Sequence, residues 1–379
     1  MKTFGVGIIG CGNISETYLK LAPLFNFIDL RAVADLNMAA AEARGKEFGV
    51  RVETIEGLLA ADDIDIVVNL TVPDAHYEVT TRILESGKHA YSEKPFVLTR
   101  DQGEALRRLA GDKNLRVGSA PDTFLGGAHQ AARAVLDEGQ AGRIVGGTCH
   151  VLGHGMEAWH PNPDFFFQPG GGPILDLGPY YITNLVQLVG PVKAVTAMAS
   201  AGFKTRTIGN GPREGEVIPV DTPTNIHAVL EFANGALITL GASWDVWAHG
   251  HANMELYGTD GSLFVPDPNF FGGQVQFAGS DAQMQDIADR GHPFGVVNHP
   301  DNDTPKFANY RCAGLADMAA GIAEERPHRC SLELATHVID VMTAILHSAH
   351  ERRWIEMTTT CDRPDPLSPA QAQALLRSA

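Results

Sequence analysis

Residues 4–15 read FGVGIIGCGNIS, and this stretch decides the fold of the N-terminal half. Its first six residues are apolar or glycine, which is typical of a short strand buried on both faces of a parallel sheet. Gly10 and Gly12 then occupy the first two positions of a G-x-G-x-x-G turn, with Ser15 at the third. The first glycine permits a tight turn, and the second lets a pyrophosphate approach the backbone where a helix begins.

The same alternation of strand and helix continues as far as residue 118. We expect further strands at 30–35, 64–70, 89–92 and 115–118, with helical patterns between them. Because parallel strands need long crossovers, this rhythm predicts an α/β domain of the Rossmann type over residues 1–122, with a doubly wound parallel sheet.

Asp35 ends the second predicted strand about 20 residues after the glycine turn, where a carboxylate binds the hydroxyls of an adenosine ribose. A carboxylate there repels a 2′-phosphate, and Leu36 and Asn37 supply no arginine to neutralise one. The sequence therefore predicts NAD as the cofactor. The predicted contacts in this region are Gly10, Gly12, Asn13, Ile14 and Asp35.

Beyond residue 123 the pattern changes. Helical patterns at 126–138 and 174–190 lie on either side of an aromatic, proline-rich loop at 154–173. Residues 191–275 read as successive strands joined by Gly, Asn and Asp turns. We expect a second, α+β domain over residues 123–379, with a mostly antiparallel sheet.

The composition excludes several classes of protein. The 379 residues include 45 acidic and 29 basic side chains, and a net charge of −16 repels nucleic acid. No stretch approaches the roughly 18 apolar residues of a membrane helix, and no signal peptide is evident. The five cysteines are scattered and odd in number, which suits reduced thiols. We expect a cytoplasmic protein with neither nucleic-acid nor membrane partners.

Several motifs follow one another in a characteristic order. They are Gly10-Cys11-Gly12-Asn13-Ile14, Thr71-Val72-Pro73 with His76, Gly87-Lys88-His89, Glu93-Lys94-Pro95, and Gly170-Gly171-Gly172 before Leu175-Asp176-Leu177-Gly178. A final helical pattern at 332–348 completes the set. Over almost the whole chain this order resembles the glucose–fructose oxidoreductase / inositol dehydrogenase / rhizopine catabolism (Gfo/Idh/MocA) family.

The resemblance implies a Rossmann domain followed by an open-faced sheet domain, paired sheet to sheet in homodimers or homotetramers. It also implies pyridine-nucleotide-dependent oxidation or reduction of a sugar, polyol or related carbonyl compound. By the same resemblance, Glu93 lies near the nicotinamide ribose and Lys94 reaches the reacting substrate oxygen. Thr71, Pro73 and His76 join Glu93 and Lys94 as predicted cofactor contacts.

Lys94 has the chemistry to accept the proton of the reacting hydroxyl. Hydride leaves a carbinol carbon only if that proton is accepted at nearly the same time, by a group whose pKa lies near the working pH. Desolvation and the positive nicotinamide would both lower the pKa of a lysine in a closed site. We therefore expect Lys94 to be the catalytic base.

Asp176 and Tyr180 form a second catalytic pair. The family usually has Asp, three residues and then His, but here the fourth residue is Tyr180, preceded by Pro179. Three proton acceptors stay open: Lys94, Tyr180 supported by Lys94, or a water relay. We favour Lys94, with Tyr180 orienting the substrate and Asp176 accepting a hydrogen bond from a sugar hydroxyl. The alternative for Tyr180 is an ordinary aromatic residue of the core. Because proline is tolerated only in a first turn, we expect this helix to begin near Asp176.

The loop at 154–173 combines aromatic and polar side chains. A sugar site needs apolar faces to cover ring carbons and polar groups to select hydroxyls, and Glu157 is among the polar candidates. The alternative is a loop that only packs the domains together. The predicted substrate-binding residues are Lys94, Asp122, Trp159, His160, Asn162, Phe165, Asp176 and Tyr180.

The histidines do not indicate a metal site. His150, His154 and His160 lack the helical H-E-x-x-H spacing, and His249 and His251 merely alternate along a strand pattern. We expect no metal.

The sequence therefore favours NAD-dependent oxidation of a monosaccharide or polyol to a lactone or ketose, with a pentose such as apiose as the specific expectation. One alternative is a glycosidase that oxidises its substrate transiently and regenerates its own NAD. Another is a nucleotide-binding regulator without catalysis, although Glu93-Lys94-Pro95 and Asp176 argue against it.

Overall fold

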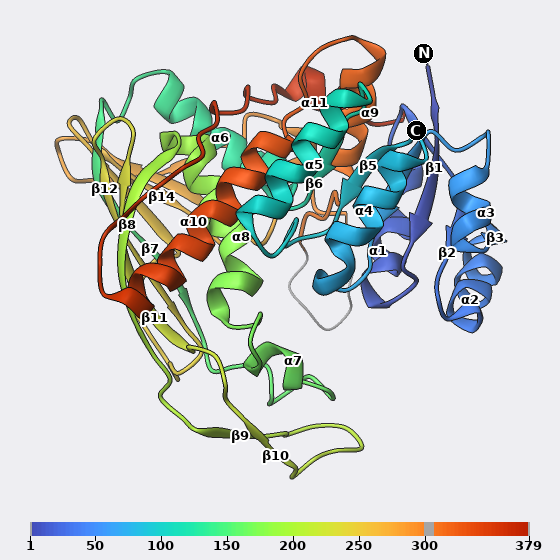
Figure 1. Cartoon of the computed structure of the whole chain (residues 1–379). Coiled ribbons are helices and arrows are strands. Elements are labelled where there is room, and N and C mark those ends of the chain that lie inside the picture. Colours follow the sequence, from blue (N-terminus) through green and yellow to red (C-terminus); the bar gives the residue numbers. More distant parts are fainter. Residues whose placement is uncertain (1, 299–306, 378–379) are drawn as a thin grey trace.

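The computed structural model describes residues 2–298 and 307–377 (Figure 1). Its first sheet is parallel throughout, in the order β3-β2-β1-β4-β5-β6. The strands are β1 (Phe4–Ile9), β2 (Ile28–Ala34), β3 (Arg51–Glu53), β4 (Ile66–Asn69), β5 (His89–Ser92) and β6 (Val117–Ser119). The helices between them are α1 (Asn13–Leu21), α2 (Met38–Phe48), α3 (Ile55–Ala60), α4 (His76–Glu85) and α5 (Arg100–Asp112). The predicted doubly wound sheet is confirmed.

Two features of this sheet bear on the site. Strands β1 and β4 are neighbours, and the chain adds strands outward from them in opposite directions. Ligands of open α/β sheets bind at the carboxyl ends of the strands where the order reverses in this way. The edge strand β3 was not predicted, because three partly exposed residues are too short to show a period.

The second sheet has nine strands in the order β16-β15-β14-β13-β7-β12-β11-β8-β17. Its neighbours pair antiparallel except for β7 with β12. The bounds are β7 (Ile144–Leu152), β8 (Val192–Ser200), β11 (Asn225–Phe232), β12 (Leu237–Ser243), β13 (Met254–Gly258), β14 (Ser262–Val265), β15 (Val275–Ala278), β16 (Met284–Ile287) and β17 (Ile355–Glu356). A mostly antiparallel sheet was expected and is confirmed.

The two faces of this sheet differ. Helices α6 (Gly127–Asp137), α8 (Pro173–Val189) and α10 (Leu332–Glu351) pack against one face. Side chains on the other face alternate outward, and Met198 and Leu237 are largely exposed there. This is the open-faced sheet that the family resemblance implied.

A small arm projects from the second sheet beside the loop at 154–173 (Figure 1). It consists of the short helix α7 (Asp164–Phe167) and a hairpin of β9 (Thr205–Thr207) and β10 (Val217–Pro219). The arm has a small core of its own, made of Phe167, Ile208, Ile218 and Trp244.

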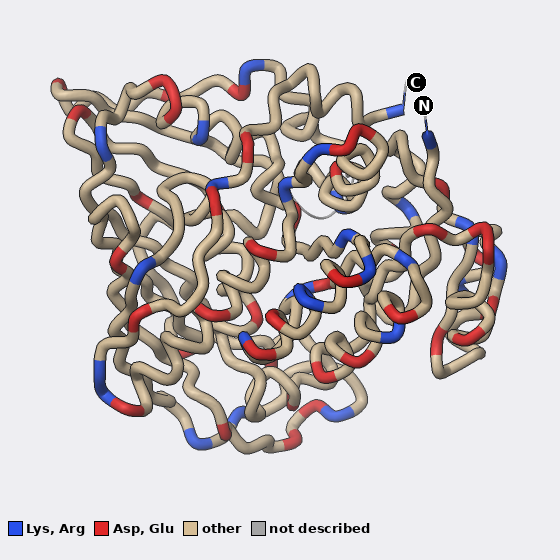
Figure 2. The backbone as a smooth tube through the Cα atoms, turned by 45° about the horizontal axis from the view of Figure 1, so that its top comes forward, with Lys and Arg blue, Asp and Glu red and all other residues tan. Residues whose placement is uncertain are grey.

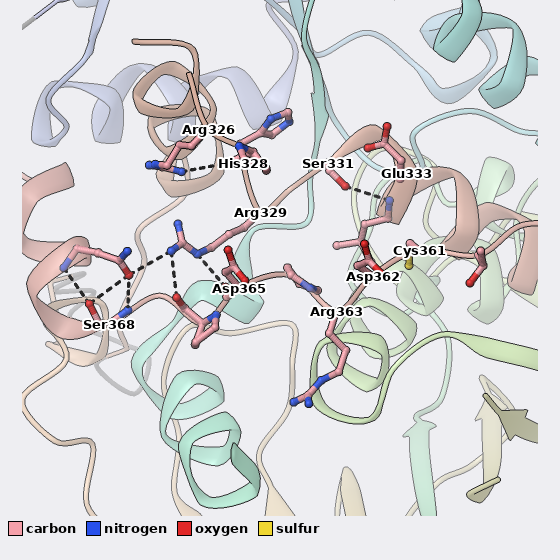
Figure 3. A pocket seen from close by; sticks show the side chains of 16 residues that line it. Arg326, His328, Arg329, Ser331, Glu333, Cys361, Asp362, Arg363, Asp365 and Ser368 are labelled. Atoms are coloured by element: carbon pink, nitrogen blue, oxygen red, sulfur yellow. Dashed lines mark hydrogen bonds between the residues drawn. The ribbon is translucent and has the colours of Figure 1, made fainter. Parts of the chain in front are cut away.

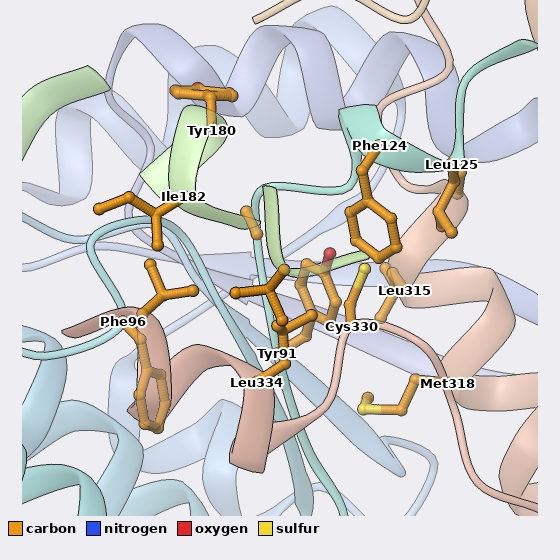
Figure 4. Packing of buried hydrophobic residues seen from close by; sticks show 14 of the residues in the cluster. Tyr91, Phe96, Phe124, Leu125, Tyr180, Ile182, Leu315, Met318, Cys330 and Leu334 are labelled. Atoms are coloured by element: carbon orange, nitrogen blue, oxygen red, sulfur yellow. The ribbon is translucent and has the colours of Figure 1, made fainter. Parts of the chain in front are cut away.

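The last helices join the two halves of the molecule. α10 packs against α5 and β6 of the first sheet as well as against β8, and α9 (Ala313–Ala323) and α11 (Pro369–Leu375) pack on each other. Figure 4 shows part of the shared core, where Tyr91 of β5 packs with side chains from α8, α9 and α10. The carboxyl end of β5, which carries Lys94, therefore lies against both halves.

The charged side chains are dispersed. Figure 2 shows Lys and Arg interspersed with Asp and Glu in that view, with no basic stripe. Within the described part of the chain, no helix is long and apolar enough to cross a membrane.

Candidate active site

The glycine turn between β1 and α1 has room for a ligand at its second glycine. Gly10 has a φ of +105°, and a Cβ there would lie 2.6 Å from the carbonyl of Leu70, so the fold itself requires this glycine. Gly12 caps the N-terminus of α1, yet a Cβ there would meet nothing within 4 Å. The packing of the chain does not explain Gly12, whereas a phosphate approaching the free N–H groups of α1 does.

Ser15, at the third glycine position, faces inward. Its side chain is buried, and its hydroxyl donates to the carbonyl of Gly12 at 2.6 Å. Serine therefore fills the place where the helix packs on the strand, and it ties the turn together.

Asp35 is fixed beside the same turn. Its carboxylate accepts the backbone N–H of Cys11 at 2.6 Å and that of Asn37 at 2.7 Å. Burial raises the pKa of the Cys11 thiol to about 11, and the charges of Asp35 and Arg44 act on that thiol in opposite directions. Arg44 is held by Glu47, at 2.7 Å, and by Glu16. A carboxylate at this place and an arginine already paired fit NAD better than NADP.

The structure gives His76 a different role from the predicted cofactor contact. Its side chain is 1% exposed, and its ring nitrogens lie 2.7 Å from the carbonyl of Pro95 and 3.0 Å from that of Thr71. Burial lowers the pKa of His76, so the neutral ring donates to one of these carbonyls. His76 thus ties the loop after β4 to the loop after β5, while Thr71 and Pro73 lie nearer the surface of the first loop.

Glu93 is also turned toward the protein and not toward an open site. Its side chain is buried; one carboxylate oxygen accepts from the Tyr18 hydroxyl at 3.0 Å and from Arg311 at 2.8 Å, and the other accepts the backbone N–H of Lys94 at 2.9 Å. Burial alone would raise the pKa of Glu93, but Arg311 and Lys94 outweigh it and hold the pKa below its usual value. The ionised carboxylate therefore positions Lys94.

Lys94 and Asp176 meet where the two halves join. The Lys94 amine lies 2.8 Å from the Asp176 carboxylate and 2.8 Å from the Asp176 carbonyl oxygen. The same amine lies 5.4 Å from the centre of the Tyr180 ring. Lys94, Asp176 and Tyr180, which the sequence assigned to catalysis, are therefore brought together.

The groups packed around Lys94 act against the expected lowering of its pKa. Burial alone would lower this pKa, but Tyr180, Asp176 and Glu93 together outweigh burial and raise it above the usual lysine value. These groups therefore favour the protonated form of Lys94.

Helix α8 begins earlier than predicted. Its first residue is Pro173, so Pro179 lies inside the helix and not in its first turn. Pro179 has no N–H to donate to the carbonyl of Leu175, and a proline ring crowds the preceding turn. In that turn the carbonyl of Asp176 accepts the Lys94 amine. Asp176 and Tyr180 still share a helix face, because they are four residues apart.

Asp122, expected in the substrate site, is fully buried elsewhere. Its carboxylate accepts the backbone N–H groups of Cys312 and Gly314, each at 3.1 Å, where α9 begins. Burial raises the pKa of Asp122 to about 6. Asp122 therefore holds the N-terminus of α9, and its place in a substrate site stays a prediction.

The loop at 154–173 presents an aromatic surface. Trp159 is 58% exposed and Phe165 55% exposed, and the ring of His160 lies edge-on to both at 5.6 Å. His160 also accepts the backbone N–H of Asn162 at 3.1 Å, which brings these four predicted substrate residues together.

Glu157 belongs to the base of the arm. It is buried and pairs with Arg206 at 2.8 Å, and Arg206 also binds Asp245. Glu157 therefore fastens this part of the loop to Arg206, as the packing alternative would require, and its role toward a substrate stays a prediction.

A cavity of about 820 Å³ lies apart from these residues (Figure 3). It is lined by Arg326, Arg329 and Arg363 among others. The Arg329 guanidinium donates hydrogen bonds to the Asp317 carboxylate at 2.6 Å and to the carbonyls of Asp365 and Pro366. Among residues 2–298 and 307–377, no group of three or more His, Cys, Asp or Glu side chains could hold a metal ion.

Sequence reasoning missed Arg311 and Tyr18. Arg311 lies 218 residues from Glu93, and no motif marks it. Tyr18 was visible only as one of the apolar positions of the helix after the glycine turn.

Two family models match the sequence. One, described as an oxidoreductase family with an NAD-binding Rossmann fold, matches residues 4–120. The other, described as the GFO/IDH/MocA C-terminal domain, matches residues 129–264.

Known proteins match part or most of the chain. Levoglucosan dehydrogenase from Pseudarthrobacter phenanthrenivorans is 28% identical over 94% of this chain and 99% of its own length. Inositol 2-dehydrogenase from Rhizobium meliloti is 31% identical over 38% of this chain and 43% of its own length. A solved structure of levoglucosan dehydrogenase in complex with NADH and L-sorbose has a TM-score of 0.79 and 25% identity, and it covers 95% of this chain and 100% of that chain.

Proposed function

The chain belongs to the Gfo/Idh/MocA family of NAD-binding oxidoreductases, and from this premise we propose that it oxidises a sugar or polyol with NAD. The observation that carries the proposal is the meeting of Lys94 and Asp176 at 2.8 Å, on the carboxyl side of the NAD-binding sheet. The relatives that match most of the chain include a sugar dehydrogenase, and its solved structure contains NADH and L-sorbose.

We propose no substrate class more specific than a sugar or polyol. The relatives described above act on levoglucosan and inositol, so they give no support to a pentose such as apiose. The exposed aromatic surface of Trp159 and Phe165, with His160 and Asn162 beside it, suits a sugar ring with apolar faces and polar edges.

NAD, when bound, accepts the hydride from the carbinol carbon. The chain must then remove the hydroxyl proton, and a protonated Lys94 cannot accept it. We assign that proton to Tyr180 supported by Lys94, whose amine lies 5.4 Å from the centre of the Tyr180 ring. Lys94 then binds the substrate oxygen as a hydrogen-bond donor. Tyr180 is 5% exposed and belongs to the buried cluster drawn in Figure 4.

Asp176 sets the position of Lys94. Its carboxylate and its carbonyl both accept from the amine, which leaves one of the three ammonium hydrogens for a substrate oxygen. Of the three proton acceptors that the sequence left open, this arrangement favours Tyr180 supported by Lys94.

The test is NADH formation from NAD with a panel of aldoses, anhydrosugars and polyols, including levoglucosan and inositol. We expect NADH absorbance with at least one member of the panel. A protein that binds NAD but forms no NADH with any member would overturn the proposal. Cleavage of a glycoside without net NADH would instead identify the glycosidase alternative.

A further inference from the structure

Arg311 reaches the site from the far end of the chain. It precedes α9, and its guanidinium lies 2.8 Å from the carboxylate of Glu93. The side chains of Arg311 and Glu93 are only 12% and 8% exposed. A pair so buried loses much of its hydration, and removing one partner leaves an uncompensated charge.

The pair continues into the proposed catalytic residues. The second oxygen of Glu93 accepts the backbone N–H of Lys94, and the Lys94 amine binds Asp176 and lies over Tyr180. Arg311 is therefore the outer end of a continuous chain of contacts. That chain runs from the segment before α9 to the group proposed to take the proton.

Arg311 is a cation where it meets Glu93. Burial alone would lower the pKa of Arg311, but the groups around it, Tyr180, Glu93, Tyr18 and Asp122, outweigh burial and raise the pKa well above its usual value.

We propose that Arg311 is a positioning residue of the catalytic centre. It holds the Glu93 carboxylate, and through it the main chain of Lys94. This inference rests on the proposed function, because Lys94 is the residue assigned there to the substrate oxygen. Arg311 itself acts through Glu93 and does not bind the substrate.

The test compares Arg311→Met and Arg311→Lys with a matched control, Arg133→Met. Arg133 is a buried arginine that pairs with Asp137 at 2.7 Å and binds backbone carbonyls, away from these residues. The measurements are kcat and KM against pH, NAD affinity by fluorescence titration, and thermal unfolding.

We expect Arg311→Met to lower kcat about 10- to 100-fold, the range for a misplaced catalytic group, with NAD affinity within about threefold of wild type. The loss should fall on kcat and not on KM for NAD, and Arg311→Lys should restore part of kcat. Arg133→Met should leave kcat near the wild-type value even where it lowers thermal stability. If Arg311→Met does not fold, Arg311→Lys still tests the geometry of the guanidinium.

Two results would overturn the inference: a wild-type kcat in folded Arg311→Met, or a fall in kcat that only follows thermal stability in both arginine variants. Failure of the proposed function gives a different result, a wild-type protein that forms no NADH with any member of the panel.

Discussion

Replacing Gly12 by alanine should separate NAD binding from folding, because its Cβ would point into space that the chain leaves empty. The folding cost is that of a poorer helix N-cap, about 0.5–1 kcal/mol. The binding cost is one or two charge-assisted hydrogen bonds to phosphate, about 1.5–3 kcal/mol, which corresponds to a roughly 10- to 150-fold weaker Kd.

Gly10→Ala is the matched comparison, since its glycine is required by the fold. At a φ of +105° a side chain is strained, and its Cβ would overlap the Leu70 carbonyl at 2.6 Å. Strain of about 1–2 kcal/mol and overpacking of about 1–3 kcal/mol should add to a loss of roughly 2–5 kcal/mol in the free energy of unfolding.

The assay pairs NAD titration by protein fluorescence with unfolding in denaturant, for both variants and the wild type. We expect Gly12→Ala to lose NAD affinity while unfolding near the wild-type midpoint, and Gly10→Ala to unfold much earlier. Gly12→Ala with wild-type NAD affinity would refute a phosphate site at this turn. Equal destabilisation of the two variants would refute the claim that the fold requires a glycine at position 10 but not at position 12.

Three further predictions follow from the site. Lys94→Ala should lower turnover by about two or more orders of magnitude with NAD affinity unchanged, and near-normal turnover would remove Lys94 from the mechanism. NAD should bind more tightly than NADP in parallel titrations, and Asp35→Ala should narrow the difference; a wild-type preference for NADP would contradict the role of Asp35. Burial raises the pKa of Asp122 from its ordinary 3.8 to about 6, so ionising it costs the folded state more than the unfolded one. Its contribution to the free energy of unfolding should therefore decline as pH rises from about 4 to 6, and Asp122→Asn should flatten that part of the profile measured in denaturant; an unchanged profile would contradict this.

The N-terminal fold could be predicted because its signals are local. The first strand, the glycine turn, the helix and Asp35 all lie within residues 4–35, and each element has a residue pattern that identifies it. The short strand β3 could not be predicted in this way. Nor could β7, whose pairing with β12 and β13 depends on segments about 90 or more residues further along the chain.

The sequence predicted which residues belong to the candidate site better than it predicted what each residue does there. Lys94 and Asp176 stood out by motif, but the sign of the Lys94 pKa shift depends on which anions the fold packs around it. Asp122 and His76 are polar residues that follow strands of the first sheet, which made them candidates for a ligand site. Only the structure shows that their side chains form hydrogen bonds with backbone groups of the protein. Arg311 had no local signal, since its partner lies in the other half of the molecule.

Isotope transfer tests the central chemistry most directly. A substrate found in the panel would be prepared with deuterium on the reacting carbinol carbon and incubated with NAD and the enzyme. The deuterium should appear in NADH by mass spectrometry, at a rate that falls about a hundredfold or more in Lys94→Ala. Oxidised product formed with unlabelled NADH, or label lost to water, would contradict direct transfer at the Lys94–Asp176 centre.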